Sequence, residues 1–565
     1  MYMRCLPAIA LRSGMHAGLA IAVIACARAP EPPAAAPVRA QAAAALAGTT
    51  HPRGGPLPAL AVATAQTVAS GATPFAAGCD GVAASGTLYI GAEVEPSFAI
   101  DPLDPTIMVG LWQQDRWSNG GSRGLVAGSS RDGGKSWQRS FPPFSRCGGG
   151  SIVNGGNYER ASDAWLSYAP NGVLHAMSLS ISGSVSAMLV SRSFDHGRTW
   201  TNAVPLIVDG AGIFNDKNAI TADPADANFV YAVWDRLNNS NSTGPTYFSR
   251  STDGGASWEA ARPIYNPGIN QQTIGNQIVV LPSGVLLDVA DWIDASQNAH
   301  VVVLRSLDRG VSWTGPIVAA DLLSTGTRSP DNGATVRDGS IIPEAAVAPN
   351  GDVYVVWQDA RFGTAGVDSI AISRSSDGGL TWTAPARVNP DPNIAAFTPS
   401  VHVNRDGVVG VMYADFRSNT ASAALSTDVW LARSSNGGAN WSELRVNEPY
   451  DLSIAPVANG LFVGDYQGLL SANGRFMPFY VRANAGDSSN RTDVVAAPLA
   501  MAGAPPLPKT AAALRAELQA RRAVRTPRMD ALRARSRENV RSRMEYPPGF
   551  ATGWLVPESV RRLQR

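Results

Sequence analysis

The chain has 565 residues, of which 45% are hydrophobic and 16% are charged. Its 55 glycines and 40 prolines favour many short elements joined by turns, and exclude a collagen, a coiled coil and a wholly disordered chain. The net charge is +1, but residues 505–565 carry +9 and the rest of the chain −8. We therefore expect no nucleic-acid partner for the acidic body.

Residues 1–26 have the pattern of an export signal. Arg4 and Arg12 precede the apolar stretch Met15 to Ala25, which is too short to span a bilayer. Val23 to Cys26 resembles the lipobox of bacterial lipoproteins, in which the cysteine is lipidated; cleavage as an ordinary signal peptide is the alternative. Both predict export, to the periplasm, to the outer membrane as a lipoprotein, or to the extracellular space.

The expected mature chain keeps only two cysteines, Cys79 and Cys147. In an oxidising compartment such a pair favours a disulfide over a zinc site, because two thiolates lack the further ligands that zinc needs. Residues 27–75 are rich in Pro and Ala and have few large side chains, which predicts a disordered tether.

Residues 76–504 contain a repeat. Six copies of the octamer S-x-D/N-x-G-x-[ST/N]-W begin at Ser130, Ser193, Ser251, Ser306, Ser375 and Ser434. The first and last of these serines are 304 residues apart, which gives a mean period of about 61 residues. Turn signals after short apolar runs occur seven times, once more than the octamer.

The clearest unit predicts four strands, at Pro343 to Pro349, Asp352 to Asp359, Ser369 to Ser375 and Ala386 to Asn389. Four-stranded antiparallel sheets with this period bury both faces only against neighbouring sheets, so they pack radially and close into a ring. We therefore predict an all-β fold, a β-propeller of seven four-stranded blades, with six blades as the alternative. The last unit lacks an octamer and a fourth strand, and we expect residues 83–91 to supply that strand.

The octamers resemble the Asp-boxes of the sialidase-like (BNR-repeat) β-propeller superfamily, here in an exported bacterial member. In such a turn an Asp or Asn side chain accepts bonds from backbone N–H groups, Gly takes a positive φ, and Trp packs over the hairpin. Because these side chains lie one per blade near the rim, we predict a structural role for them. They are Asp132, Asp195, Asp253, Asp308, Asp377 and Asn436.

The strand order predicts a second group of polar residues at the opposite end of the blades. Several second strands end with an Asp followed closely by an Arg, and the first strands begin with charged residues such as Glu95 and Lys217. In one interpretation each Asp pairs with an Arg and fixes the blades. In the other, a few Arg hold a carboxylate of a ligand while acids and a Tyr catalyse. We expect the structural role for most and the functional role for a minority.

The resemblance implies specific roles, because sialidases hold the sugar carboxylate with three Arg, use a Tyr assisted by a Glu as nucleophile, and protonate the leaving group with an Asp. The substrate-binding candidates are Arg116, Arg160, Arg236, Arg361 and Arg417. The catalytic candidates are Asp115 or Asp163 as the acid, Tyr466 as the nucleophile, and Glu344 or Glu159 as its partner. Val94 to Phe98 departs from the family, since it stands where an Arg-Ile-Pro element is expected and contains no Arg.

The resemblance predicts an exported glycoside hydrolase of the exo-α-sialidase type that acts on an anionic glycan, with its site opposite the Asp-boxes. The alternative is a non-catalytic propeller that binds a glycan or a protein on the same face. We expect a monomer without cofactor or metal site, although a structural calcium ion held by loop carboxylates stays open. A membrane tether through the N-terminal lipid is the other expected contact.

Residues 505–565 predict a basic helical tail, with helices at Ala511 to Ala523 and Met529 to Met544. Arginines lie all round the second helix, so we do not expect it to insert into a membrane. We expect a solvated or loosely docked extension, with attachment to anionic lipid or envelope polymer as the alternative.

Overall fold

The computed structural model describes residues 66–82, 86–240, 242–420, 424–499 and 526–544. This part of the chain is nearly all β, with one α-helix, α3 (Thr526–Met544), and one short 3₁₀ helix, η1 (Leu452–Ile454). The export signal, Cys26 and the helix expected at Ala511 to Ala523 lie outside the described residues. None of the described helices is long and apolar enough to cross a membrane.

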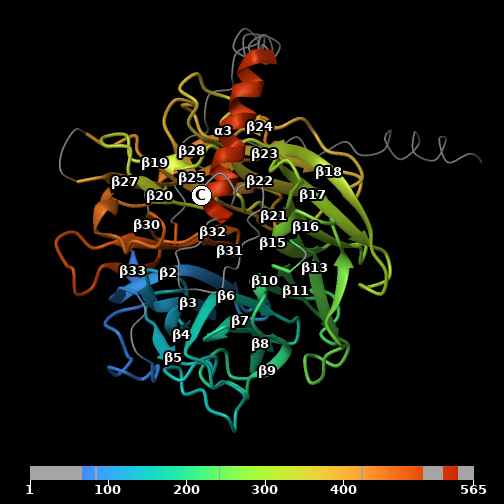
Figure 1. Ribbon diagram of the computed structural model, residues 1–565, viewed down its shortest axis with the longest axis vertical. Helices are drawn as coiled ribbons and strands as arrows, with labels where there is room; N and C mark the ends of the chain where they lie inside the picture. The colour runs from blue at the N-terminus through green and yellow to red at the C-terminus, as the bar shows by residue number, and fades with distance from the viewer. Residues whose placement is uncertain (1–65, 83–85, 241, 421–423, 500–525, 545–565) are drawn as a thin grey trace, which may run out of the picture. The chain divides into compact units, whose positions relative to one another are not determined.

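The strands pair in consecutive antiparallel sets (Figure 1). The first set is β2 (Leu88–Ile100), β3 (Met108–Trp117), β4 (Ser122–Ser130) and β5 (Gln138–Ser140). The second is β6 (Arg160–Tyr168), β7 (Leu174–Ser182), β8 (Val185–Ser193) and β9 (Val204–Asp209). A single residue pair, Ser122 with Ala161, joins the two sets.

The next two sets follow the same order. One is β10 (Ile213–Ala222), β11 (Val230–Asn238), β13 (Thr246–Ser251) and β14 (Arg262–Tyr265). The other is β15 (Gln271–Val280), β16 (Leu286–Ile293), β17 (Ala299–Ser306) and β18 (Thr314–Leu322). The short β12 (Thr243–Gly244) pairs with β11 and, in parallel, with β15, and so connects them.

Two further sets have shorter outer strands. They are β21 (Glu344–Val347), β22 (Val353–Asp359), β23 (Ser369–Ser375) and β24 (Ala386–Arg387), then β25 (Ala396–Val403), β26 (Val409–Asp415), β27 (Ser426–Ser434) and β28 (Ser442–Arg445). The short β29 (Tyr450–Asp451) also pairs with β27. A small separate sheet contains β19 (Thr327–Arg328), β20 (Thr335–Arg337) and β30 (Leu461–Phe462).

The last sheet corrects one expectation from the sequence. Its strands are β31 (Gly468–Ala472), β32 (Arg475–Ala483), β33 (Thr492–Ala496) and β1 (Thr67–Val68). The outer strand is thus supplied by residues 67–68, at the end of the segment assigned to the tether, and not by residues 83–91. The expected strand was wrong because Leu88 begins β2, whose buried run pairs with β3 instead.

The first strands of the sets contact one another in a closed cycle: β2, β6, β10, β15, β21, β25, β31 and again β2. Apolar side chains fill the space between neighbouring sets. Leu111 and Leu174, for example, share one buried cluster across the first two sets, and Leu287 and Val355 share another. Sheets that bury both faces against neighbours in a closed cycle form a β-propeller.

The Asp-box side chains are bonded within their own turns. Asp132 Oδ1 accepts bonds from the backbone N–H groups of Lys135 (2.9 Å) and Ser136 (3.0 Å), and Gly134 has a φ of 86°. The indole N–H of Trp137 donates to Gly134 O at 3.1 Å. Comparable side-chain bonds recur at Asp195, Asp253, Asp308, Asp377 and Asn436. The octamer therefore stabilises the turn that it forms.

An arginine just before the octamer links each of several sets to the next. Arg192 donates to Gly254 O (2.9 Å), and Arg250 donates to Arg309 O (2.7 Å). Arg305 donates to Gly378 O at 2.8 Å. Each acceptor belongs to the Asp-box turn of the following set, so this end of the propeller is held together by a repeated backbone contact.

Two features lie outside the repeat. Cys79 and Cys147 form a disulfide, as expected. Helix α3 buries Leu532 and Val540 against the propeller, and Arg533 lies 3.3 Å from Asp321. Over residues 526–544 the tail is therefore closely packed on the propeller and not a solvated or loosely docked extension.

Candidate functional site

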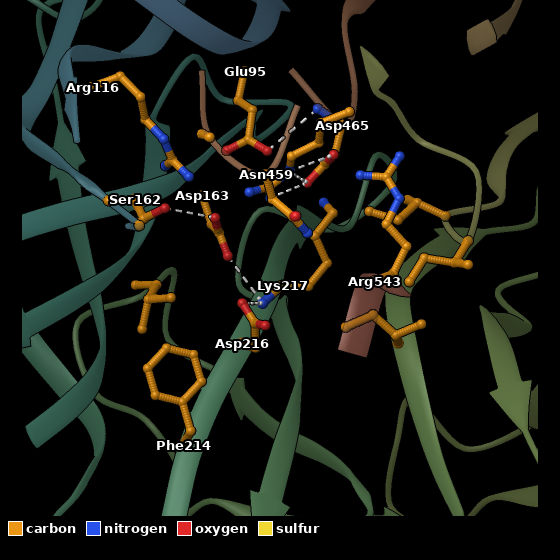
Figure 2. Close-up of a pocket in the computed structure, with 18 of the residues that line it drawn as sticks. Glu95, Arg116, Ser162, Asp163, Phe214, Asp216, Lys217, Asn459, Asp465 and Arg543 are labelled. Carbon is orange, nitrogen blue, oxygen red and sulfur yellow. Dashed lines mark hydrogen bonds and ion pairs between the residues drawn. The ribbon is translucent and has the colours of Figure 1, made fainter. Parts of the chain in front are cut away.

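A pocket lies at the end of the propeller opposite the Asp-box turns. Because each set is antiparallel, the start of its first strand and the end of its second share one end, whereas the Asp-box follows the third strand at the other. The cavity itself has a volume of about 50 Å³ and opens to solvent. Its charged lining residues are Glu95, Arg116, Asp163, Asp216, Lys217, Asp465 and Arg543, which Figure 2 labels, and Arg337 and Asp338.

Irregularities in the first strands direct three of these side chains. Glu95 (φ 54°), Asp163 (φ 55°) and Lys217 (φ 44°) have left-handed backbone conformations at register shifts in β2, β6 and β10. The corresponding shift in β15 contains Gly275, which takes a positive φ without strain. β-Bulges re-aim side chains, and strained non-glycine residues persist where the surrounding structure holds them. In these three first strands the irregular backbone position therefore carries a charged side chain that lines the pocket.

Glu95 is held in its protonated form. Burial, together with the charges of nearby Asp465 and Asp163, raises its pKa to about 8, although Arg116 and Arg337 act in the opposite direction. Gln113 Nε2 donates to Glu95 Oε2, and the backbone N–H of Asp465 lies 3.4 Å from Glu95 Oε1. At neutral pH the carboxyl of Glu95 therefore carries a proton that it can donate.

Asp465 has the opposite protonation behaviour. Arg337 contacts it through Nε (3.1 Å) and Nη2 (2.5 Å). Burial raises the pKa of Asp465, but the guanidinium of Arg337 outweighs this effect and the pKa is lowered overall. The pocket therefore holds a protonated and an ionised carboxyl group side by side, which is the arrangement that acid–base chemistry at neutral pH requires.

Asp163 and Asp216 share one backbone donor. The N–H of Lys217 lies 3.0 Å from Asp163 Oδ2 and 2.9 Å from Asp216 Oδ1, and Ser162 Oγ donates to Asp163 Oδ1 at 2.8 Å. Burial, then the charges of Asp163 and Asp235, raises the pKa of Asp216 well above its usual range. Asp163 accepts bonds on both of its carboxyl oxygens.

The cationic groups are fixed by aromatic rings. The guanidinium groups of Arg116 and Arg337 lie 5.0 Å and 4.2 Å from the ring centre of Phe462. Lys217 Nζ lies 3.9 Å from the ring centre of Tyr466. Cation–π contacts of this kind hold a cation in place, and the charge of Arg337 is also balanced by its ion pair with Asp465.

The remaining arginine candidates do not line this pocket. Arg160 stacks on Trp117 at 4.5 Å and donates to Gly120 O at 2.6 Å; burial and the charge of Arg116 lower its pKa to about 10. Three others form ion pairs of 2.6 to 2.7 Å: Arg236 with Asp209, Arg361 with Asp359, and Arg417 with Asp415. These three contacts match the structural interpretation of the Asp–Arg pattern.

The other catalytic candidates also lie outside the lining. Asp115 accepts bonds from Gly91 N (2.9 Å) and Thr73 Oγ1 (2.8 Å), and Glu159 accepts one from Ser182 Oγ (3.1 Å). Burial raises the pKa of Glu344 to about 7. The hydroxyl of Tyr466 donates to Ala164 O at 3.1 Å, and burial, with Glu95 and Asp163, raises its pKa well above its usual range. Tyr466 thus lies beneath Lys217, and its phenol is bonded away from the pocket.

Several pocket residues were not among the sequence candidates. Glu95, Lys217 and Asp465 lie in first-strand starts or the loop before one, so their position was recognisable although their role was not. Arg337 lies in a non-repeating connection, and Arg543 lies in the basic tail. In the described part of the chain, no group of three or more His, Cys, Asp or Glu side chains is arranged to hold a metal ion.

Comparison with known proteins identifies the repeat. Residues 215–448 match the family described as "BNR repeat-like domain". Over these residues, which are less than half of the chain, the sequence is similar to BNR-repeat domains. No curated protein sequence matches the chain.

Solved structures with similar chains have different activities in their names. A Hadza microbial sialidase has 15% identity, with 67% of this chain and 73% of that chain covered and a TM-score of 0.41. An α-L-arabinofuranosidase from Fusarium graminearum has 14% identity, coverages of 57% and 88%, and a TM-score of 0.40. A protein of unknown function from Dyadobacter fermentans has 16% identity, coverages of 73% and 95%, and a TM-score of 0.41. The activity of this propeller has to be argued from its own residues.

Proposed function

We propose that this BNR-repeat propeller is an exported glycoside hydrolase of sialidase-like type that acts on an anionic glycan, with the pocket as its active site. One observation carries the proposal: Glu95, a carboxyl group that keeps its proton at neutral pH, lies in the same pocket as the ionised carboxylate of Asp465 and several guanidinium groups. Glycosidases use two carboxyl groups whose environments push their pKa values apart.

The residues divide the reaction between them. Glu95 donates its proton to the glycosidic oxygen as the bond from that oxygen to the anomeric carbon breaks. The carboxylate of Asp163 stabilises the positive charge that develops on the sugar ring. Water then adds to the anomeric carbon, and its proton returns the acid to its starting form.

The positive charges of the pocket favour an acidic substrate. Arg116 and Arg337 are held against Phe462, and Lys217 is held against Tyr466. Guanidinium groups recognise carboxylates, and burial strengthens the attraction because water screens it less. The substrate class that fits is a glycoside with a carboxylate substituent.

The strand sets support seven four-stranded blades. Each set has its own first strand in the closed cycle, and the last set takes its outer strand from Thr67–Val68. With this grouping the pocket lies at the mouth of the central channel, because its lining comes from the starts of several first strands.

The prediction of Tyr466 as nucleophile requires a rearrangement. Its phenol would have to leave Ala164 O and lose a proton in a site where buried acids raise its pKa. These contacts favour, as a second candidate, a non-catalytic propeller that binds an acidic glycan or protein at the same pocket. Both functions require an acidic ligand, but only the hydrolase converts it to product.

The test uses the purified full chain with fluorogenic sialoside and glucuronide substrates and a neutral arabinofuranoside. We expect release from an acidic substrate and a loss of at least about 100-fold in kcat for Glu95→Gln, because the proton donor is removed. The matched control is Glu443→Gln, since burial also raises the pKa of Glu443 to about 8 but Glu443 pairs with Arg417 away from the pocket. An absence of turnover of every acidic glycoside by the wild-type protein overturns the hydrolase, and a glycan array then tests binding.

A further inference from the structure

The last turn of helix α3 reaches the pocket. Arg543 is one of the lining residues (Figure 2). Its guanidinium donates to Asp338 O at 2.7 Å and to the carboxylate of Asp338. Asn459 Nδ2, also at the pocket, lies 3.4 Å from Ser542 O in the same turn. A residue from the basic tail is thus part of the pocket wall.

The helix fits its place on the propeller closely. Asn539 Nδ2 lies 3.2 Å from Ser340 Oγ, and Ser536 Oγ donates to Leu322 O at 3.3 Å. A Cβ atom at Gly326 would stand 2.5 Å from Asn539 Oδ1. A Cβ atom at Gly366 would likewise collide with Arg535. At these two glycines the helix side chains come close to the propeller backbone.

The charge of Arg543 matters because of its partner. The side chain of Asp338 is fully buried and also accepts bonds from Thr327 N (2.8 Å) and Gln358 Nε2 (3.0 Å). Without Arg543 the pocket wall would keep the negative charge of Asp338 and lose the cation beside it. Removing this one cation would therefore both reduce attraction and add repulsion for an anionic ligand.

We propose that Arg543 is a specificity-determining residue: the C-terminal helix supplies a cation that makes the pocket select an acidic ligand. The ligand class rests on the proposed function, whereas the role of the helix rests on its contacts. The pocket is present with Arg543 in place, and the guanidinium is anchored to Asp338 in its wall. The helix thus contributes one side chain to the wall of the pocket.

The test compares Arg543→Gln with Arg541→Gln in the full chain. Arg541 is exposed on the same turn, so its substitution makes the same change of charge without touching the pocket. We expect Arg543→Gln to raise KM for an acidic glycoside at least about tenfold and to leave KM for a neutral one unchanged. Equal KM values for the two variants would overturn the inference.

A binding readout separates this inference from the proposed function. N-acetylneuraminic acid and glucuronic acid should raise the melting temperature of the wild-type protein, and glucose should not. The shift should vanish in Arg543→Gln, persist in Arg541→Gln and be partly kept in Arg543→Lys, which retains the charge. If no glycoside is turned over but this pattern is found, the hydrolase fails and the inference stands. If neither acid shifts the wild-type protein, or if Arg543→Gln retains the full shift, the inference fails.

Hydrogen exchange of the amides in α3 checks that the helix remains docked. The buried side chains of Leu532 and Val540 also hold the helix on the propeller. We therefore expect the amide protection of α3 to persist in Arg543→Gln. Loss of protection would mean that Arg543 only anchors the helix, and that outcome contradicts a specificity role if Arg543→Lys also restores no binding.

Discussion

The two ends of the propeller follow opposite rules. At the Asp-box end, exposed carboxylates are satisfied within their own turns, and their hydrogen bonds lower the pKa of Asp132, Asp253 and Asp308 to about 2. At the pocket end, carboxyl groups are buried, and burial raises the pKa of Glu95 to about 8 and that of Asp216 above its usual range. The Asp-box turns thus stabilise each ionised carboxylate by hydrogen bonds within the turn. The pocket, in contrast, gathers protonated carboxyl groups and charged side chains from several strand sets.

The difference also shows in how the repeat varies. In every copy the Asp-box side chain accepts a bond from the backbone N–H four residues later, whereas the positive-φ position of the first strands is Glu95, Asp163, Lys217, Gly275 or Thr398 according to the set. A repeated residue can serve the blade that contains it. A residue that occurs once, in a strained conformation and beside unlike neighbours, is more useful for locating a site.

The largest expected effect is the loss of activity on substitution of Asp163 at the pocket end, compared with Asp195 at the Asp-box end of the same strand set. Asp163→Asn should lower kcat/KM for an acidic glycoside by at least about 100-fold, because an amide cannot stabilise the positive charge of the transition state. Asp195→Asn makes the same change in the Asp-box between β8 and β9 and should leave kcat/KM unaltered. Steady-state kinetics on both variants decides between the two ends. Equal losses would mean that the pocket end has no special role.

The two ends should also respond oppositely to pH. Glu95 and Asp291 have pKa values raised to about 8, mainly by burial, so the folded chain keeps protons that the unfolded chain releases near pH 4 to 5. Their contribution to the unfolding free energy is full below that range and declines as pH rises toward 8. The Asp-box carboxylates, with lowered pKa values, contribute fully above about pH 4 and lose this contribution toward pH 2.

Urea unfolding at pH 5 and pH 8 measures this difference. We expect the wild-type protein to be more stable at pH 5, and Glu95→Gln to remove a part of the decline on the order of a few kcal/mol. Asp308→Asn should leave the decline between pH 5 and pH 8 unchanged, because Asp308 is ionised throughout that range. A wild-type stability that rises from pH 5 to pH 8 would contradict the protonated state of Glu95.

The sequence was sufficient where the determining contacts are local. The six octamers predicted the turns, their bonds and the propeller, because each carboxylate finds its partners within five residues. The same locality explains the Asp–Arg pattern, since Arg361 and Arg417 pair with the aspartates two residues before them. A recurring pattern was therefore a better guide to structure than to substrate binding.

The sequence was insufficient where contacts join distant segments. Thr67 and Val68 form a strand of only two residues in a Pro/Ala-rich region, so no alternation marked them. Arg337 meets Asp465 across 128 residues, and Arg543 meets Asp338 across 205. Nothing in the helix distinguishes Arg543 from its neighbouring arginines, and only the packing of α3 places it at the pocket.

A smaller effect is expected from removing one Asp-box carboxylate. In Asp308→Ala the turn loses the bonds from Ser312 N (2.9 Å) and Ser306 Oγ (2.8 Å), as well as that from Ser312 Oγ. The unfolding free energy should fall by about 1 to 2 kcal/mol, as for the loss of a capping side chain, with no change in kcat. Leu307→Ala, which truncates an exposed neighbour in the same turn, is the control for urea unfolding. A loss of activity without a loss of stability would assign the Asp-box end a role in the reaction.

The smallest effect tests whether the Asp-box needs a charge at all. Asn436 performs the same task with an amide oxygen, which accepts bonds from Ser434 Oγ (2.8 Å) and Asn440 N (3.0 Å). In Asp377→Asn one oxygen can keep the bonds from Leu380 N (3.1 Å) and Thr381 N (2.9 Å), while the bond from Thr381 Oγ1 to the second oxygen is lost. We expect a loss below about 1 kcal/mol at pH 7, and the reverse change Asn436→Asp should give a gain of similar size. Since hydrogen bonds lower the pKa of Asp377 despite its partial burial, the difference between Asp377→Asn and wild type should shrink as the pH falls below about 4. If the stability difference instead grew as the pH falls, the protonated carboxyl would stabilise the turn more than the carboxylate does. The explanation of the Asp-box turn by hydrogen bonds to an ionised carboxylate would then be wrong.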